Sequence, residues 1–302
     1  MRKFLLGLAV LAIVAAACAP EDDTTEPADS GTSAAEPVDA ATCAADATLV
    51  NDGTLTIATG NPAYKPWYGG KSVEDSEWES GQFTGDPHSA EGYESAFAYA
   101  LAEELGFTED QVQWLGIPFN KSFAPGPKDF DFVLQQISYK PERDDAVDFS
   151  ESYYNVNQAL VSAEGTSVAD ATTIADLKDA KLGAPIGTTS LDVITDQVQP
   201  TQEPAVYDDL AQAVTDLQNG DIDGIVVDLP TAFFMAAVQI KHGVVVGQFG
   251  AESDEYFAMA FETGSPLVQC VDLALEEMKA DGTLDDIEQQ WLADKTNAPV
   301  LD

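Results

Sequence analysis

The stretch that decides the fold is residues 131–150, DFVLQQISYKPERDDAVDFS. It begins inside a short apolar run, 130–134, which carries one acid and predicts a buried strand. The run breaks at Lys140-Pro141, and Arg143 comes just after the break. A guanidinium pairs bidentately with a carboxylate, and open α/β sheets bind ligands beyond the carboxyl ends of their strands. The stretch therefore predicts either a carboxylate clamp at Arg143 or a solvated arginine in an acidic turn.

Length and charge limit the classes of function. The chain has 302 residues, enough for two domains with separate cores. It carries 13 Lys and Arg against 53 Asp and Glu, a formal net charge of −40. Such a surface repels phosphate backbones, so we expect no nucleic-acid partner. The acidity fits solubility, for example in a saline medium, or attraction of cations, and does not identify a ligand.

The N-terminal segment has the features of an export signal. Residues 1–18 contain two basic residues, an apolar core and three alanines before Cys18. This pattern resembles the lipobox of bacterial lipoproteins and predicts lipidation of Cys18; a signal peptide cut near Ala17 is the alternative. Residues 19–50 are acidic and poor in large apolar side chains, which predicts a disordered tether. We therefore expect an extracytoplasmic module, lipid-anchored to the outer face of the cell membrane or periplasmic.

Two further cysteines, Cys43 and Cys270, stand far apart in the sequence. An exported pair favours one disulfide between the start of the folded module and a late helix. Two free buried thiols are the alternative.

The order of elements indicates an α/β fold. A β-rich run at 54–59, an amphipathic helix from Tyr93 to Gly106 and a strand near 112–117 precede the opening stretch. This alternation is typical of a parallel sheet flanked by helices. We expect the chain to cross to a second lobe and return, with lobe 1 at 51–157 and 250–302 and lobe 2 at 158–249.

Polar groups follow several of the expected strands. In the second lobe, Thr188 and Thr189 begin a helix, where backbone amides bind anions or the hydroxyl only caps the helix. Asp228 ends a strand, where it can hold an ammonium or cap the next helix. In the first lobe, Tyr64 and Trp67 lie in a proline-bounded loop and form either a flat ligand wall or a cap on the core. Together Arg143, the threonine amides and Asp228 match the two charged ends of an α-amino acid.

At this point the sequence resembles a known family, the polar amino-acid binding proteins of ABC importers (solute-binding family 3). The matching segments, in the family's order, are AYKPW, QISYKPERDDAVDFSESYY, GAPIGTTS, GDIDGIVVD and LALEEMKADGTLDDIEQQWL. The resemblance implies a two-lobed, type II periplasmic-binding-protein fold with two crossover strands, in which each lobe is a mostly parallel sheet flanked by helices. It also implies a ligand in the cleft between the lobes.

The resemblance assigns roles by position. Arg143 and the Thr189 amide would bind the ligand α-carboxylate with help from Ser138, and Asp228 would bind the α-ammonium. The remaining expected ligand-binding residues are Asn61, Tyr64, Trp67, Gln136 and Thr188. Gln136 departs from the small residue or hydroxyl common there, and Lys140 replaces a threonine, which leaves the ligand side chain open.

The predicted function is the substrate-binding component of an ABC transporter, which captures an amino acid and delivers it to the permease and its ATPase subunits. We expect a monomer without a cofactor or metal. Two alternatives are an enzyme resembling the cyclohexadienyl dehydratases, which share the fold, and a ligand-sensing module. The only histidines, His88 and His242, lie in unrelated loops, and no cysteine–histidine cluster or Ser/His/Asp set is evident. We therefore expect no enzymatic activity.

Overall fold

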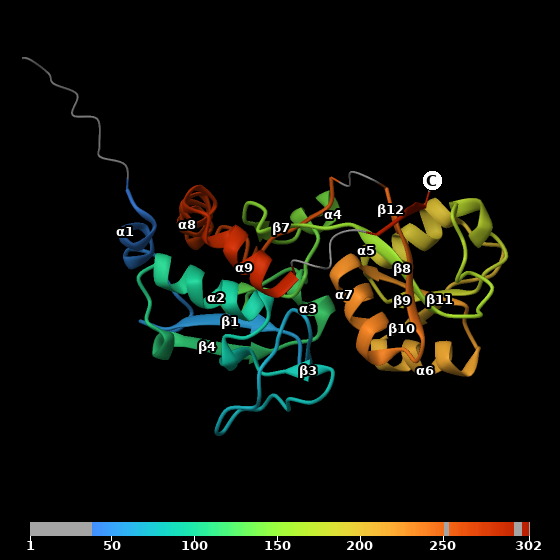
Figure 1. Ribbon diagram of the computed structural model, residues 1–302. Helices are drawn as coiled ribbons and strands as arrows, with labels where there is room; N and C mark the ends of the chain where they lie inside the picture. The colour runs from blue at the N-terminus through green and yellow to red at the C-terminus, as the bar shows by residue number, and fades with distance from the viewer. Residues whose placement is uncertain (1–37, 251–253, 293–297, 302) are drawn as a thin grey trace, which may run out of the picture. The chain divides into compact units, whose positions relative to one another are not determined.

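Figure 1 shows the protein as a computed structural model, which describes residues 38–250, 254–292 and 298–301. The expected signal segment, Cys18 and most of the expected tether lie outside these residues. Among the described residues, no helix combines the length and the apolar character that crossing a membrane requires.

The first sheet contains the opening stretch. Its five strands have the order β4-β1-β5-β14-β6. Their bounds are β1 Leu55–Thr59, β4 Val112–Gly116, β5 Phe132–Val133, β6 Asp148–Phe149 and β14 Ala260–Phe261. Strand β1 pairs in parallel with β4 and β5, whereas β14 is antiparallel to both of its neighbours.

The second sheet has six strands in the order β10-β9-β11-β8-β12-β15. Their bounds are β8 Gln158–Ala163, β9 Leu182–Pro185, β10 Ala205–Tyr207, β11 Gly224–Asp228, β12 Gly243–Phe249 and β15 Val300–Leu301. Strand β8 is antiparallel to both β11 and β12. Each sheet therefore contains one strand that runs against both of its neighbours, β14 in the first sheet and β8 in the second, and its other pairings are parallel, which agrees with the prediction of mostly parallel sheets. Strand β8 follows the first crossing, and β14 follows the second.

The two crossing segments pair with each other. Strand β7 (Tyr154–Asn155) precedes the first crossing and is antiparallel to β13 (Tyr256–Phe257), which follows the second. A fourth, two-stranded sheet joins β2 (Ala63–Tyr64) to β3 (Thr84–Gly85).

Helices cover both sheets. The α-helices are α1 Ala40–Ala45, α2 Tyr93–Glu104, α3 Phe119–Ser122, α4 Pro141–Asp144, α5 Thr189–Asp192, α6 Leu210–Asn219, α7 Leu229–Phe234, α8 Leu267–Asp281 and α9 Thr283–Leu292. Helices α5 and α7 continue into π-helical segments, η4 (Val193–Val198) and η5 (Met235–Gln239). Short 3₁₀ segments are η1 Pro87–Ser89, η2 Glu109–Gln111 and η3 Ile174–Leu177. In Figure 1, α2, α8 and α9 lie on the same side of strands β1 and β4.

Alternate residues of β11 pack on opposite faces of the second sheet. Ile225 and Val227 belong to one apolar cluster, and Val226 belongs to another. Successive side chains of a strand point to opposite faces, so a strand buried on both sides is an unbroken apolar run. This explains why the run ends at Asp228, the first residue of the strand that is not fully buried.

The acid inside the opening apolar run has a structural role. Asp131 is 7% exposed, and its carboxylate accepts hydrogen bonds from the backbone amides of Val50 (2.8 Å) and Thr56 (2.7 Å). Because buried polar groups need partners, these two bonds compensate much of the cost of burying the acid beside β5. The bond from Val50 also attaches the segment that precedes β1 to the first sheet.

The chain differs from the expected boundaries at two ends. Residues 40–45 form helix α1, capped by the Asp39 carboxylate at the Thr42 amide, although the predicted tether ran to residue 50. Cys43 on α1 forms a disulfide with Cys270 on α8. At the other end, β15 pairs with β12 of the second sheet, although the prediction placed residues 250–302 in the first lobe. The remaining lobe boundaries stay a prediction.

We expect reduction of the Cys43–Cys270 bond to lower the melting temperature, because the bond closes a loop with a sequence separation of 227 residues. A disulfide typically contributes about 2–4 kcal/mol. Calorimetry with and without a reducing agent measures the effect, with the double variant Cys43→Ala/Cys270→Ala as the control that reductant should not change. Equal melting temperatures for the oxidised and reduced protein would contradict the expectation.

Candidate functional site

Arg143 is buried and contacts both halves of the chain. Its side chain lies on α4, directly after the break at Lys140-Pro141, and is 6% exposed. Nη1 donates to the Ser138 carbonyl at 2.6 Å, and Nη2 donates to the Gly187 carbonyl at 2.9 Å. The guanidinium carbon lies 4.4 Å from the centre of the Phe123 ring. The alternative in which Arg143 is a solvated arginine in an acidic turn is therefore excluded.

Burial also acts on the charge of Arg143. It lowers the pKa of the guanidinium, whereas the nearby charges of Asp192, Glu255 and Glu142 act in the opposite direction. An arginine stays protonated in proteins, so the buried positive charge attracts an anion.

Two hydroxyl groups lie beside this arginine. Ser138 is 2% exposed and follows β5, and its Oγ lies 3.4 Å from Oγ1 of Thr189, the first residue of α5. Ser138 also forms an isolated antiparallel bridge with Phe257. We call Arg143, Ser138 and Thr189 the carboxylate-binding set, because the sequence analysis assigned these three to one carboxylate.

Thr188 takes the capping role that the sequence analysis left open. Its Oγ1 accepts from the Leu191 amide at 3.3 Å and donates to the Pro185 carbonyl at 2.8 Å. The hydroxyl thus fixes the turn between β9 and α5. Through this turn Thr188 sets the position of Thr189.

Asp228 ends β11 and lies in the same neighbourhood. Its Oδ1 accepts from Gln158 Nε2 at 2.7 Å. Burial raises the pKa of Asp228 to about 7, the negative charge of Glu255 adds to this effect, and the hydrogen bond from Gln158 opposes it. An acid in this setting favours a cationic partner, since burial disfavours its lone negative charge.

Gln158 connects several of these groups and was missed by the sequence analysis. It is 2% exposed at the start of β8. Its Oε1 accepts from Ser190 Oγ at 2.6 Å, and its Nε2 lies 3.3 Å from Thr189 Oγ1. The sequence offers only a polar residue directly before an apolar run that predicts a strand. An exposed glutamine fits that pattern equally well.

Glu255 is the second residue that the sequence analysis missed. It lies just before β13, and its Oε1 accepts from Ser138 Oγ at 2.6 Å and from Gln158 Nε2 at 3.2 Å. One acid among 53 carries no sequence signal of this kind. Its proximity to Ser138 results from a pairing between segments more than a hundred residues apart.

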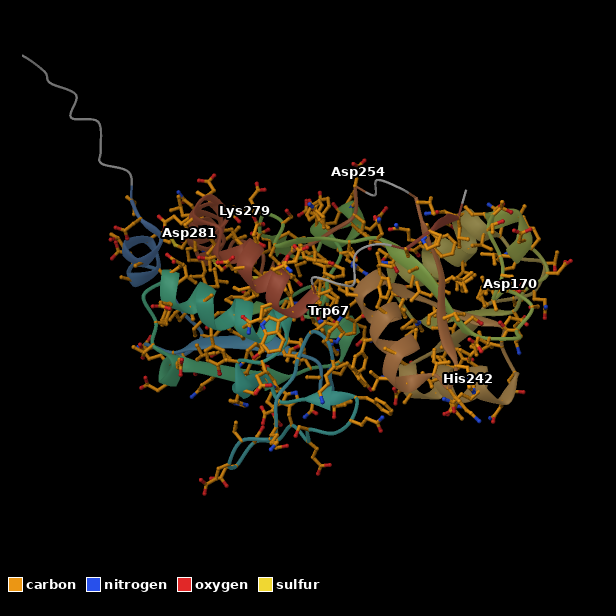
Figure 2. All side chains as sticks on the ribbon, viewed as in Figure 1. Trp67, Asp170, His242, Asp254, Lys279 and Asp281 are labelled. Carbon is orange, nitrogen blue, oxygen red and sulfur yellow. A yellow bond between two sulfur atoms is a disulfide. The ribbon has the colours of Figure 1, made fainter. Side chains whose placement is uncertain are left out.

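Tyr64 and Trp67, the aromatic residues of the proline-bounded loop, do not form one flat surface for a ligand. Trp67, labelled in Figure 2, is 1% exposed and meets Tyr93, Tyr154 and Phe257 edge-on at 5.9, 5.6 and 5.5 Å. Its indole nitrogen donates to Thr231 Oγ1 at 2.9 Å. This favours the alternative in which Trp67 caps the core.

Tyr64 is only half-buried. Its hydroxyl donates to Asp209 Oδ1 at 3.1 Å, at the N-terminus of α6. Tyr64 and Trp67 thus each bond to a helix that packs on the second sheet. Of the two rings, Tyr64 keeps the exposed surface that stacking on a ligand requires.

Two other expected site residues bond elsewhere. Asn61 is exposed, and its amide donates to the Glu77 carbonyl at 3.4 Å. Gln136 has a left-handed backbone (φ 46°), and its backbone amide donates to Glu94 Oε1 at 2.8 Å. Glu94 is fully buried, and burial raises its pKa to about 7. The structure therefore does not bring Asn61 or the Gln136 side chain to the carboxylate-binding set.

The unusual Lys140 forms an ion pair across the site. Its ammonium contacts the Asp192 carboxylate on α5, next to the carboxylate-binding set. The lysine that departs from the family pattern thus links the loop after β5 to the helix that carries Thr189.

The two histidines take no part in this cluster. His88 Nδ1 lies 2.8 Å from Asp86 Oδ1, and His242, labelled in Figure 2, directly precedes β12. Within residues 38–250, 254–292 and 298–301, no three His, Cys, Asp or Glu side chains are grouped to hold a metal ion. The chemistry that the cluster offers is the pairing of one buried guanidinium and its hydroxyl neighbours with an anion, and of Asp228 with a cation.

Comparison with curated proteins shows a related binding protein. The chain is 32% identical over 216 residues to the L-cystine-binding protein TcyJ of Escherichia coli (strain K12), covering 69% of this chain and 77% of that protein.

Two solved structures share the fold. An ancestral arginine-binding protein bound to glutamine matches 80% of this chain and 99% of its own, with 27% identity and a TM-score of 0.63. The ancestral amino acid-binding protein AncCDT-1, a precursor of cyclohexadienyl dehydratase, matches 79% of this chain and 95% of its own, with 27% identity and a TM-score of 0.61. These likenesses confirm the two-lobed α/β fold.

The family model for bacterial extracellular solute-binding proteins, family 3, matches residues 74–294. That range includes Arg143, Ser138, Thr189 and Asp228. The chain belongs to this family.

Proposed function

We propose that the protein binds a free α-amino acid between its two lobes and delivers it to the permease and ATPase subunits of an ABC transporter. The observation that carries the proposal is the position of Arg143: one buried guanidinium bonds to a carbonyl after β5 of the first sheet and to a carbonyl after β9 of the second. A group so placed can hold a carboxylate against both lobes at once.

The assigned roles follow from the charges. Arg143, the Ser138 hydroxyl and the Thr189 amide would bind the α-carboxylate, and Asp228 would bind the α-ammonium. Charged hydrogen bonds contribute about 1.5–3 kcal/mol each. Three or four of them support micromolar binding, about −8 kcal/mol, after the ordering costs of association.

The ligand side chain is polar in this proposal. The relative TcyJ binds L-cystine, and the ancestral arginine-binding protein holds glutamine. Asp228 and Glu255 near the site disfavour an acidic side chain, because a third carboxylate would add repulsion. Tyr64 would stack on the side chain, and Thr188 would contribute by fixing the turn.

The cellular setting rests on the sequence. Cys18 would be the lipidated first residue, and the acidic segment that follows would tether the monomeric module to the outer face of the membrane. Membership of an extracellular family supports a position outside the cytoplasm.

Catalysis on the same fold is the competing function, since AncCDT-1 is a precursor of an enzyme. A thermal-shift screen of the twenty amino acids and common dipeptides identifies ligands, because a ligand stabilises the folded state it binds. Incubation of each hit with the protein, followed by mass analysis, then separates the two. A binding protein returns every hit unchanged, whereas a converted hit would contradict the proposal.

We expect Arg143→Ala to weaken amino-acid binding at least tenfold, on the order of 1.5–3 kcal/mol, because it removes a charge-assisted hydrogen bond. Arg143→Lys keeps the charge and loses the planar fork, so we expect an intermediate affinity. Isothermal titration calorimetry measures both, and circular dichroism checks that each variant is folded. Wild-type affinity in folded Arg143→Ala would refute the clamp.

We also expect affinity to depend on pH through Asp228, whose pKa burial raises to about 7. The ammonium pairs with the ionised carboxylate, so a proton and the ligand compete for it. Lowering the pH from 8 to 6 passes through this pKa and should weaken binding about tenfold. Calorimetry at pH 6, 7 and 8 tests this, and Asp228→Asn should bind weakly with no such dependence. An affinity that is constant over this range would argue against the pairing.

A further inference from the structure

Glu255 contacts Ser138, one of the three residues of the carboxylate-binding set. Its Oε1 lies 2.6 Å from Ser138 Oγ, and Ser138 Oγ lies 3.4 Å from Thr189 Oγ1. The charge of Glu255 also acts on Arg143. A carboxylate of the protein itself therefore bonds to Ser138 of the carboxylate-binding set and acts through its charge on Arg143.

While Ser138 donates its hydrogen bond to Glu255, its hydroxyl cannot donate to a second carboxylate. A serine hydroxyl has one proton to donate, and Ser138 donates it to Glu255. Gln158 Nε2 has two, and Asp228 lies 2.7 Å from it, Glu255 3.2 Å and Thr189 3.3 Å. A ligand carboxylate can accept a hydrogen bond from the Ser138 hydroxyl only if the bond from Ser138 to Glu255 is broken.

The backbone directs Glu255 into this position. The Tyr139 amide donates to the Tyr256 carbonyl at 3.1 Å, and the Ala258 amide donates to the Ile137 carbonyl at 3.0 Å, so residues 137–139 run beside 256–258. Successive side chains of an extended segment point to opposite sides. Asp254 is exposed and points outward in Figure 2, whereas the next side chain, Glu255, reaches Ser138.

Glu255 also affects the acid assigned to the ammonium. Its carboxylate and that of Asp228 share the Gln158 amide, and its charge helps to raise the pKa of Asp228. Two carboxylates that bond to the same amide nitrogen repel each other in a buried setting. Movement of Glu255 away from Ser138 would relieve this repulsion and favour the ionised form of Asp228 that an ammonium needs.

We propose that Glu255 competes with the α-carboxylate of the ligand for the Ser138 hydroxyl and is displaced when an amino acid binds. The inference rests on the proposed function of the carboxylate-binding set. Glu255 thus weakens the affinity for amino acids. An acid that bound a cationic side chain of the ligand would instead strengthen it.

The test compares Glu255→Gln and Glu255→Ala with wild type by calorimetry, with the amino acid that binds wild type best. Both variants remove the competing charge, so we expect binding about tenfold tighter, with the larger gain for alanine. The gain should be smaller for the α-amide of the same amino acid, because that ligand brings no carboxylate. Asp254→Asn removes one negative charge from the neighbouring exposed position and should leave the affinity within about twofold of wild type.

Each other outcome overturns the proposal. Weaker binding by the Glu255 variants means that Glu255 pairs with the ligand. Unchanged affinity with a lower melting temperature means that the hydrogen bond between Glu255 and Ser138 only stabilises the fold. An equal gain for the amino acid and its α-amide means that the effect does not act on the carboxylate. In these three cases loss of binding in Arg143→Ala still supports the proposed function, whereas a wild-type protein that binds no amino acid refutes both.

Discussion

The site depends on the burial of one guanidinium. A charge moved out of water needs close partners of opposite polarity, and Arg143 has the carbonyls of Ser138 and Gly187 and the face of Phe123. These partners come from the loop after β5, the turn after β9 and the segment that follows β4. The geometry of the anion site therefore depends on packing in both sheets, and no single loop could form it alone.

The electrostatics of the site are local, despite a net charge of −40 on the chain. Charges on an exposed surface are screened within about 10 Å at ordinary salt. Inside the cluster the charges act at short range: Asp192 pairs with Lys140, Asp192 and Glu255 both act on Arg143, and Glu255 also acts on Asp228. In the proposed complex a zwitterion would add no net charge there, and each of its ends would meet a group of opposite sign.

The sequence predicted those parts of the site that a short segment determines. Arg143 after a broken strand, the helix start at Thr188 and the acid that ends β11 all occupy the expected places. Gln158 and Glu255 could not be predicted, because their roles come from contacts between segments distant in sequence. Trp67 shows the same limit: a proline-bounded loop predicts an aromatic at the site, but the side on which the ring packs depends on Phe257 from the returning chain.

The position of the crossings explains why the two residues that were not predicted, Gln158 and Glu255, lie at the candidate site. Gln158 begins the strand that follows the first crossing, Glu255 precedes β13, and Ser138 is bridged to Phe257 within β13. Asp228 instead ends β11 of the second sheet, and Arg143 lies on α4, between β5 and β6 of the first sheet. A rotation of one sheet against the other would change the distance from Arg143 to Gly187, while the bridge at Ser138 would move little because its two sides are adjacent backbone. The Ser138–Glu255 contact is therefore tied to the crossing itself, and a ligand that breaks it acts where the relative orientation of the two sheets is set.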